Sequence, residues 1–275
     1  MKGGPAINNK SIKEEYILVS VLVTLLLAYL ACYFVDIRNV FGLRDWMVTN
    51  EKIDIPFLWD YLFTEGGPIE ILQWFMLGFF ALTSSYIAGK LMADRRTQES
   101  IFWKLLALLG IIMLMEDAGN LRHFFADRMV LLFRDEMIYR TLTELLYFSL
   151  LALIPLVALI KHHQVPFKNK KTAVFLLSGY LFYGIAVIFS GTRDIGFWYQ
   201  RAGGYLYDAT IAMGGEELLS LYQKTNEFLS QVQSISLEYR FMDYLVEESL
   251  ELIGSTMLWI SSLSYLNYIS KRVNS

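Results

Sequence analysis

The sequence has little cysteine, little histidine and little charge. It contains one cysteine, Cys32, three histidines, and only 19% charged residues in a chain of 275. A single cysteine excludes an intrachain disulfide and any Cys-x-x-Cys metal or redox motif. Three histidines are few for a zinc hydrolase. The net charge of -3, without a basic patch that interleaves aromatic residues, favours no nucleic-acid partner.

The sequence is rich in apolar residues. The chain is 55% hydrophobic and 15% aromatic, with a mean hydropathy of +0.39, whereas soluble domains carry about 25% charged residues. About 20 apolar residues cross a bilayer core of roughly 30 Å as a helix. We therefore predict an all-α polytopic membrane helix bundle, a single integral membrane domain over 1–275. Its six transmembrane helices would cover about 16–36, 69–92, 101–121, 139–160, 172–190 and 241–269.

The stretches between these spans are predicted as a tail and loops. Residues 1–15 are predicted to form a cytoplasmic tail, and residues 37–68 and 191–237 are predicted to form outer loops. The Gly66-Gly67-Pro68 turn signal predicts that Pro68 lies in the first turn of a helix. We expect one interfacial amphipathic helix over 124–137 and another amphipathic helix within 191–237, which lies either on the membrane or against the bundle. A signal peptide is the alternative for the first span, but several more spans follow it.

Basic residues predict the orientation. With six spans, one face receives most lysines: Lys2, Lys10, Lys13, Lys90, Arg95, Arg96, Lys161, Lys168, Lys170, Lys171, Lys271 and Arg272. Short basic loops face the cytoplasm, so both termini should be cytoplasmic in an inner (plasma) membrane.

Carboxylates from four spans then meet near the outer leaflet. An acidic side chain at membrane depth is a candidate functional residue, because it must face protein or water and find a partner. The candidate cation or metal ligands are Glu70, Glu116, Asp117, His123, Glu144, Glu248 and Glu251. The candidate counter-ions or anion-binding residues are Arg140, Arg193 and Arg240. The plain alternative is that part of this set lies in water at the span ends or pairs with arginine, for example Glu144 with Arg140.

Such a site would bind a cation, including a divalent metal ion as a possible cofactor. The leading hypothesis is an outward-facing site of a cation or cation/proton-coupled transporter. A second is a metal-dependent membrane enzyme of hydrolase or di-iron type, and a third is a scaffolding subunit of a membrane complex or a binder of anionic lipid headgroups. No catalytic residue is identified. The expected partners are the lipid bilayer and a homo-oligomer or membrane complex.

Three short motifs carry a family resemblance. They are Glu65-Gly66-Gly67-Pro68-Ile69-Glu70, the pair Glu116-Asp117 followed by His123, and Glu247-Glu248-Ser249-Leu250-Glu251 with Gly254. Together they resemble a group of uncharacterised bacterial multi-pass membrane proteins that show Asp-Glu and then His-Glu after the third span. This chain has Glu-Asp instead and lacks the glutamate after His123. The resemblance implies a multi-pass fold and brings no established activity. The chain resembles ceramidase-type membrane hydrolases only in having acids and a histidine near one leaflet, because their paired late histidines are absent.

Overall fold

The fold was analysed in a computed structural model, which describes residues 14–50, 55–121, 124, 128, 136–232 and 235–273. The described residues form helices and short connections, and no strand occurs among them. The all-α prediction is confirmed. The interfacial helix predicted over 124–137 lies mostly outside the described residues.

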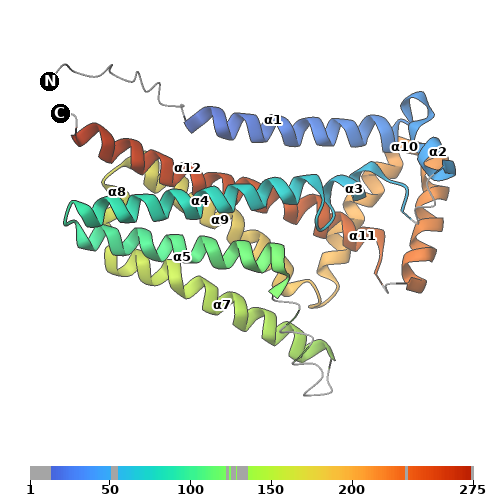
Figure 1. Cartoon of the computed structure of the whole chain (residues 1–275). Helices are drawn as coiled ribbons and strands as arrows, with labels where there is room; N and C mark the ends of the chain where they lie inside the picture. Colours follow the sequence, from blue (N-terminus) through green and yellow to red (C-terminus); the bar gives the residue numbers. More distant parts are fainter. Residues whose placement is uncertain are drawn as a thin grey trace.

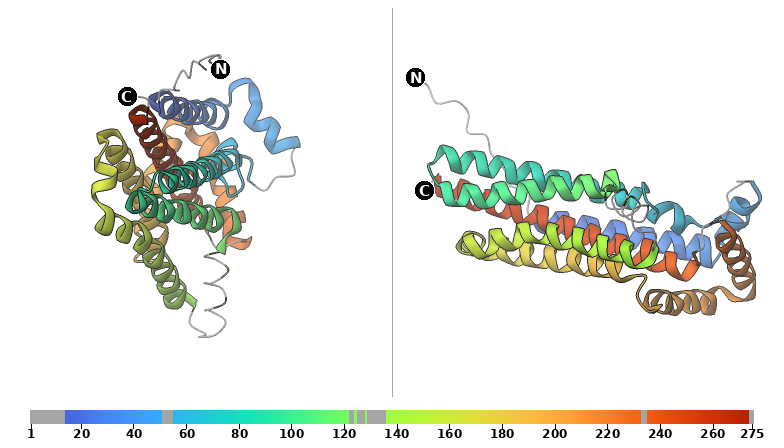
Figure 2. Two further views of the ribbon diagram at one scale, coloured as in Figure 1. Left: turned by 60° about the vertical axis from the view of Figure 1, so that its left-hand side comes forward. Right: turned by 90° about the horizontal axis from the view of Figure 1, so that it is seen from below.

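Six long helices run alongside one another (Figures 1 and 2). A helix covers most of each of the six predicted stretches: α1 (Glu14–Cys32), α4 (Pro68–Ala93), α5 (Thr97–Gly119), α7 (Glu136–His162), α9 (Lys170–Thr192) and α12 (Glu248–Val273). Pro68 is the first residue of α4 after Gly67, as predicted. The remaining elements are η1 (Tyr33–Ile37), η2 (Val40–Gly42), α2 (Leu43–Asn50), α3 (Leu58–Phe63), α8 (Gln164–Phe167), α10 (Trp198–Val232), α11 (Leu237–Arg240) and η3 (Phe241–Glu247).

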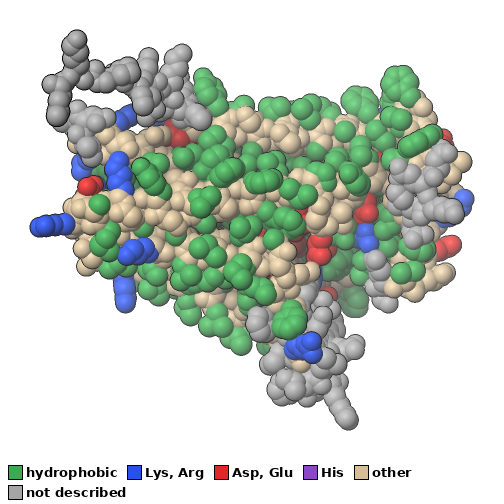
Figure 3. Space-filling model, viewed as in Figure 1, with side chains coloured by type: hydrophobic (Ala, Val, Ile, Leu, Met, Phe, Trp, Pro, Cys, Tyr) green, Lys and Arg blue, Asp and Glu red, His purple; other side chains and the backbone are tan. Residues whose placement is uncertain are grey.

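Within the described part of the chain, four helical stretches are long and apolar enough to cross a membrane. They are Glu14–Ile37, Leu58–Ala93, Thr141–His162 and Lys170–Thr192, which is fewer than the six predicted. Hydrophobic side chains cover much of the visible surface between the two ends of the molecule (Figure 3), which indicates a helical membrane protein. The two helices that are not among the four, α5 and α12, bury much of their surface inside the bundle. The α12 helix also carries buried serines and the half-buried Glu248 and Glu251, which lower its hydropathy.

The α12 helix lies in the middle of the bundle, in contact with α1, α4 and α9, while α5 packs on α4, and α7 packs on α5 and α9. Its contact with α9 depends on two glycines. A Cβ atom on Gly179 would lie 3.0 Å from the Gly254 carbonyl oxygen, and one on Gly254 would lie 2.9 Å from the Tyr183 amide nitrogen. The missing side chains let the two backbones approach closely, which sets the depth of Tyr183 beside α12.

The two ends of the bundle differ in charge. Lysine and arginine side chains gather at the end where α4 meets α5, α7 meets α9, and α12 finishes, here called the basic end (Figure 3). Glu14 of α1 lies at the same end, where it accepts a hydrogen bond from Asn267 Nδ2 at 2.7 Å. The opposite end, here called the acidic end, holds α2, α3, α10, α11 and η3.

An ion cluster around the buried Glu99 joins elements at the basic end. Glu99 at the start of α5 accepts hydrogen bonds from Arg96 Nε (2.8 Å) and Nη2 (2.5 Å) and from the Tyr265 hydroxyl of α12, and Lys168 Nζ lies 3.0 Å from its Oε1. Burial alone would raise the pKa of Glu99, but the hydrogen bonds from Arg96, Tyr265 and Lys168 outweigh it and lower that pKa to about 2.

The segment 191–237, predicted as an outer loop, is mostly helix. The α10 helix runs over 35 residues and kinks at Gly215, where φ is +76°. Leu218, Tyr222 and Leu229 on its apolar face are buried in a core cluster with residues of α1, α3 and α4. The second predicted interfacial helix is therefore a helix packed against the bundle.

Candidate carboxylate chamber

Carboxylates from α4, α5, η3 and α12 converge on one small cavity at the acidic end. The cavity has a volume of about 40 Å³ and is called the carboxylate chamber. It is lined by Glu65, Glu70, Glu116, Asp117, Asn120, Ser190, Arg193, Asp243, Tyr244, Glu247, Glu248 and Glu251. One water needs roughly 10–15 Å³ in this measure, so the chamber has room for a few waters or one small cation. Acidic side chains are visible in a recess toward this end (Figure 3).

Gln73 of α4 joins two acids across the chamber. Its Nε2 donates to Asp117 of α5 and, over 2.8 Å, to Glu251 of α12. The Tyr183 hydroxyl of α9 donates to the same Asp117 oxygen over 3.2 Å. Gln73 is fully buried, and its Oε1 has no hydrogen-bond partner among the described residues. Four helices therefore meet through neutral donors that fix the positions of two carboxylates.

Arg193, just after α9, forms a second bridge. Its Nη1 lies 3.3 Å from Asp243 and its Nη2 lies 3.6 Å from Glu144 of α7, with only 8% of the arginine exposed. Glu144 is buried and lies behind this arginine, outside the chamber lining. Arg193 also borders a larger cavity of about 530 Å³ between the end of α9, α10 and α11. Arg193 therefore lines both that cavity and the carboxylate chamber.

Tyr199 of α10 donates a hydrogen bond to Glu247. Burial raises the pKa of the Tyr199 hydroxyl, and the charge of Glu247 raises it further, so the phenol stays protonated and remains a donor. Glu247 is thereby held by a neutral partner. Arg193 instead forms ion pairs with Asp243 and Glu144.

Glu248 differs from its neighbours because its Oε2 is fully buried and has no hydrogen-bond partner among the described residues. It begins α12 directly after η3, a π-helical stretch. Wide π-turns often occur at functional sites, and this one places Asp243, Glu247, Glu248 and Glu251 in one cavity. A buried carboxylate oxygen that lacks a donor is the arrangement expected where a proton or another cation binds.

The remaining predicted residues lie as follows. Glu70 lines the chamber but also accepts a hydrogen bond from the Gly66 amide at the start of its own helix. Arg240 lies outside the chamber and pairs with Asp60 of α3, with Nη1 and Oδ1 2.5 Å apart. His123 and the side chain of Arg140 lie outside the described residues.

The chamber carries a large excess of negative charge. Eight carboxyl groups line it, and Arg193 is the one cationic side chain among the described lining residues. Within the described part of the chain, no three His, Cys, Asp or Glu side chains are grouped so that they could hold a metal ion. Among the described residues, the chamber therefore holds no preformed tetrahedral or octahedral ligand set.

Among the contributors that sequence reasoning missed are Tyr183, Tyr199 and Asp243. Asp243 and Glu247 are four residues apart, as are Glu247 and Glu251. This spacing is the signal that could have identified Asp243 as a member of the candidate site. Nothing in the sequence distinguishes Tyr183 and Tyr199 from other tyrosines, because their role depends on which way α9 and α10 face. No family model, curated protein or solved structure matches this chain. The family resemblance stays a prediction, and the geometry carries the functional argument.

Proposed function

We propose that this chain is a six-span inner-membrane protein whose carboxylate chamber faces outward and binds a small cation. The α5 and α12 helices have 23 and 26 residues, enough to cross about 30 Å at 1.5 Å per residue. Their neighbours shield their polar side chains from lipid, which makes crossing tolerable. The basic end then faces the cytoplasm together with both termini.

The observation that carries cation binding is Glu248 Oε2, a buried oxygen without a donor among the described residues of a chamber lined by eight carboxyl groups. Carboxylates this crowded cannot all be ionised unless protons or other cations neutralise them. An incoming cation would therefore displace protons. A divalent metal ion remains among the cations to be tested, because carboxylate and amide oxygens suit hard cations.

Buried hydroxyl groups on α12 favour coupled transport rather than a binding site that is closed toward the cytoplasm. Between Glu251 and the basic end the helix carries Ser255, Thr256, Ser261, Ser262 and Ser264, all at most 2% exposed. The first four donate to backbone carbonyls of their own helix, and the Ser264 hydroxyl has no hydrogen-bond partner among the described residues. Opposite them, Ser84 of α4 and Thr172 of α9 have buried hydroxyls without hydrogen-bond partners among the described residues. We extend the proposal to cation/proton exchange along this line, which flux measurements in proteoliposomes would test.

Calorimetric titration of the purified full-length protein tests the binding step. Methylammonium, Na⁺, K⁺, Mg²⁺ and Ca²⁺ are titrated in two buffers of different ionisation enthalpy, which reveals released protons. The wild type should bind at least one of these cations with proton release. The Glu248→Gln variant should bind it at least about tenfold more weakly.

The matched control is Glu227→Gln, which changes an exposed carboxylate of α10 outside the chamber. This variant should bind like the wild type. Binding that is equally strong in Glu248→Gln, or absent from the wild type for every cation, would contradict the proposed function.

A further inference from the structure

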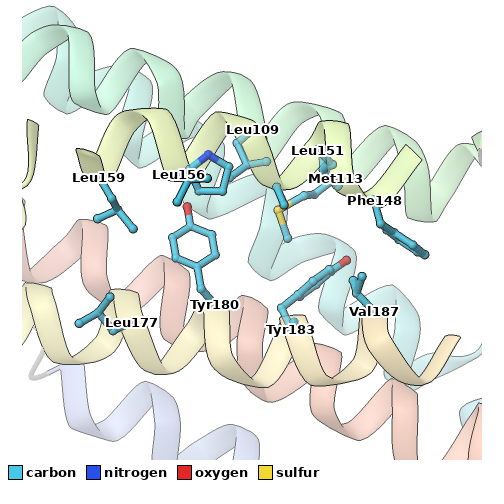
Figure 4. Close-up of a pocket in the computed structure, with 13 residues that line it drawn as sticks. Leu109, Met113, Phe148, Leu151, Leu156, Leu159, Leu177, Tyr180, Tyr183 and Val187 are labelled. Atoms are coloured by element: carbon cyan, nitrogen blue, oxygen red, sulfur yellow. The ribbon is translucent and has the colours of Figure 1, made fainter. Parts of the chain in front are cut away.

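An apolar groove lies between α5, α7 and α9 (Figure 4). Its volume is about 280 Å³, and leucine, methionine, phenylalanine, valine and two tyrosines form most of its wall. Tyr180 and Tyr183 extend from α9 toward the other two helices (Figure 4). Apolar cavities of roughly 150 Å³ already bind molecules the size of benzene. The groove is large enough for a segment of hydrocarbon chain.

The groove and the carboxylate chamber adjoin each other along two helices. On α5, Met113 lines the groove and Asp117, one turn later, lines the chamber. On α9, Val187 lines the groove and Ser190, one turn later, lines the chamber. One end of the groove therefore lies one helical turn from the chamber wall.

Tyr183 belongs to both sites. Its ring lines the groove, and its hydroxyl donates to Asp117 of the chamber over 3.2 Å. On α7, Phe148 lines the groove and Glu144, one turn earlier, pairs with Arg193 of the chamber. The apolar groove and the carboxylate chamber therefore adjoin each other at Tyr183.

We propose that the two sites together bind one amphiphile, with a primary ammonium head in the carboxylate chamber and its hydrocarbon chain in the groove. This proposal rests on the proposed function, because it names the class of cation that the chamber takes. A primary ammonium group is about the size of a water and fits a chamber of about 40 Å³. An anionic head would meet the excess of carboxylates and be repelled.

Such a ligand can enter the groove laterally from the bilayer. The α7 helix contacts α5 and α9, and its outer surface exposes a row of leucines: Leu142, Leu146, Leu150 and Leu153. A chain dissolved in the bilayer reaches the groove beside this helix without crossing water.

Gly184 offers a way to fill the groove without disturbing the fold. It lines the groove, and a Cβ atom added there meets nothing within 4 Å. Gly184→Phe should therefore occupy the space of the chain. The matched control is Gly89→Phe, an exposed helical glycine of α4 that also has open space at Cβ and does not line the groove.

The experiment uses dodecylamine that carries a photoreactive diazirine in its chain, added to the full-length protein in lipid nanodiscs. Labelled peptides are identified by mass spectrometry. Label should appear on α5, α7 and α9, and excess dodecylamine should displace it. Labelling should fall at least about tenfold in Gly184→Phe and in Glu248→Gln and stay unchanged in Gly89→Phe.

A dodecanol probe with the same diazirine tests the role of the ammonium head. Equal labelling of the groove by the alcohol would overturn the inference. Amine labelling that is unchanged in both Glu248→Gln and Gly184→Phe would overturn it as well. In either case the groove is a crevice filled by bilayer lipid. Methylammonium binding to the chamber is measured in the same preparations. If methylammonium binds and the long-chain amine does not label the groove, this inference fails and the proposed function stands. If no cation binds, both fail.

Discussion

Glu248 combines a functional position with an unfavourable one. Its Oε2 is buried without a donor among the described residues, and an unmatched buried acceptor costs about 1–3 kcal/mol. Replacement by glutamine removes the charge and introduces an amide that can donate to neighbouring carboxylates. We predict that Glu248→Gln stabilises the protein by about 1–2 kcal/mol without added cation while it weakens cation binding. Thermal unfolding followed by tryptophan fluorescence checks the stability change.

Glu227→Gln is the control for this prediction and should stay within about 0.5 kcal/mol of the wild type, since Glu227 is exposed. A loss of more than about 1 kcal/mol in Glu248→Gln would mean that the carboxylate is a structural partner.

Glu99 gives a prediction about pH at the basic end. Burial works against its ionised form, but hydrogen bonds from Arg96, Tyr265 and Lys168 lower its pKa in the folded protein to about 2 from an ordinary value of 4.5. A lowered pKa stabilises the folded state above the unfolded value, and that contribution disappears as the pH falls toward the folded value. The extra stability of wild type over Glu99→Gln should be constant near pH 7 and shrink between about pH 4.5 and 2.

The measurement is the difference in unfolding temperature between the two proteins across this pH range. A difference that does not change on acidification would show that the ion cluster around Glu99 does not stabilise the fold.

At the scale of elements, the crossing of α9 and α12 depends on Gly254. A Cβ atom there would lie 2.9 Å from the Tyr183 amide nitrogen, which is backbone and cannot turn away. Gly254→Val should force the two helices apart and cost about 1–3 kcal/mol. The same unfolding assay measures this cost. Gly89→Val, at a helical glycine with open space around it, should cost less than about 1 kcal/mol. Equal stability of the two variants would refute the close approach.

The apolar runs predicted where the long helices lie, because hydrophobic length is a local property of the sequence. Pro68 likewise predicted the start of α4. The partners inside the chamber were harder to predict. Glu144 lies 3.6 Å from Arg193 at the end of another helix, a pair that the sequence did not indicate, while its predicted pairing with Arg140 involves a side chain outside the described residues. Such pairs, and the π-turns of η3, depend on how the helices rotate and pack, which a local pattern does not specify.

At the scale of the whole molecule, six crossings and four crossings predict opposite sides for the same residues. With six, the α7–α9 connection at His163 is cytoplasmic and Glu216 of α10 is outside. If only the four apolar stretches cross, His163 is outside and Glu216 is cytoplasmic. Single-cysteine variants His163→Cys and Glu216→Cys, made in a Cys32→Ser background, can be labelled in intact cells with a maleimide that does not cross the membrane. We predict labelling of Glu216→Cys alone, whereas labelling of His163→Cys alone would establish four crossings.

The measurement that tests the central claim most directly is infrared difference spectroscopy of the protein as a cation is added. If the carboxylate chamber exchanges protons for a cation, the band of protonated carboxyl groups must fall and the carboxylate band must rise. We predict this change with methylammonium, or with whichever cation calorimetry identifies, and its loss in Glu248→Gln. Cation binding without any loss of protonated carboxyl signal, or the same change in Glu248→Gln, would contradict the account.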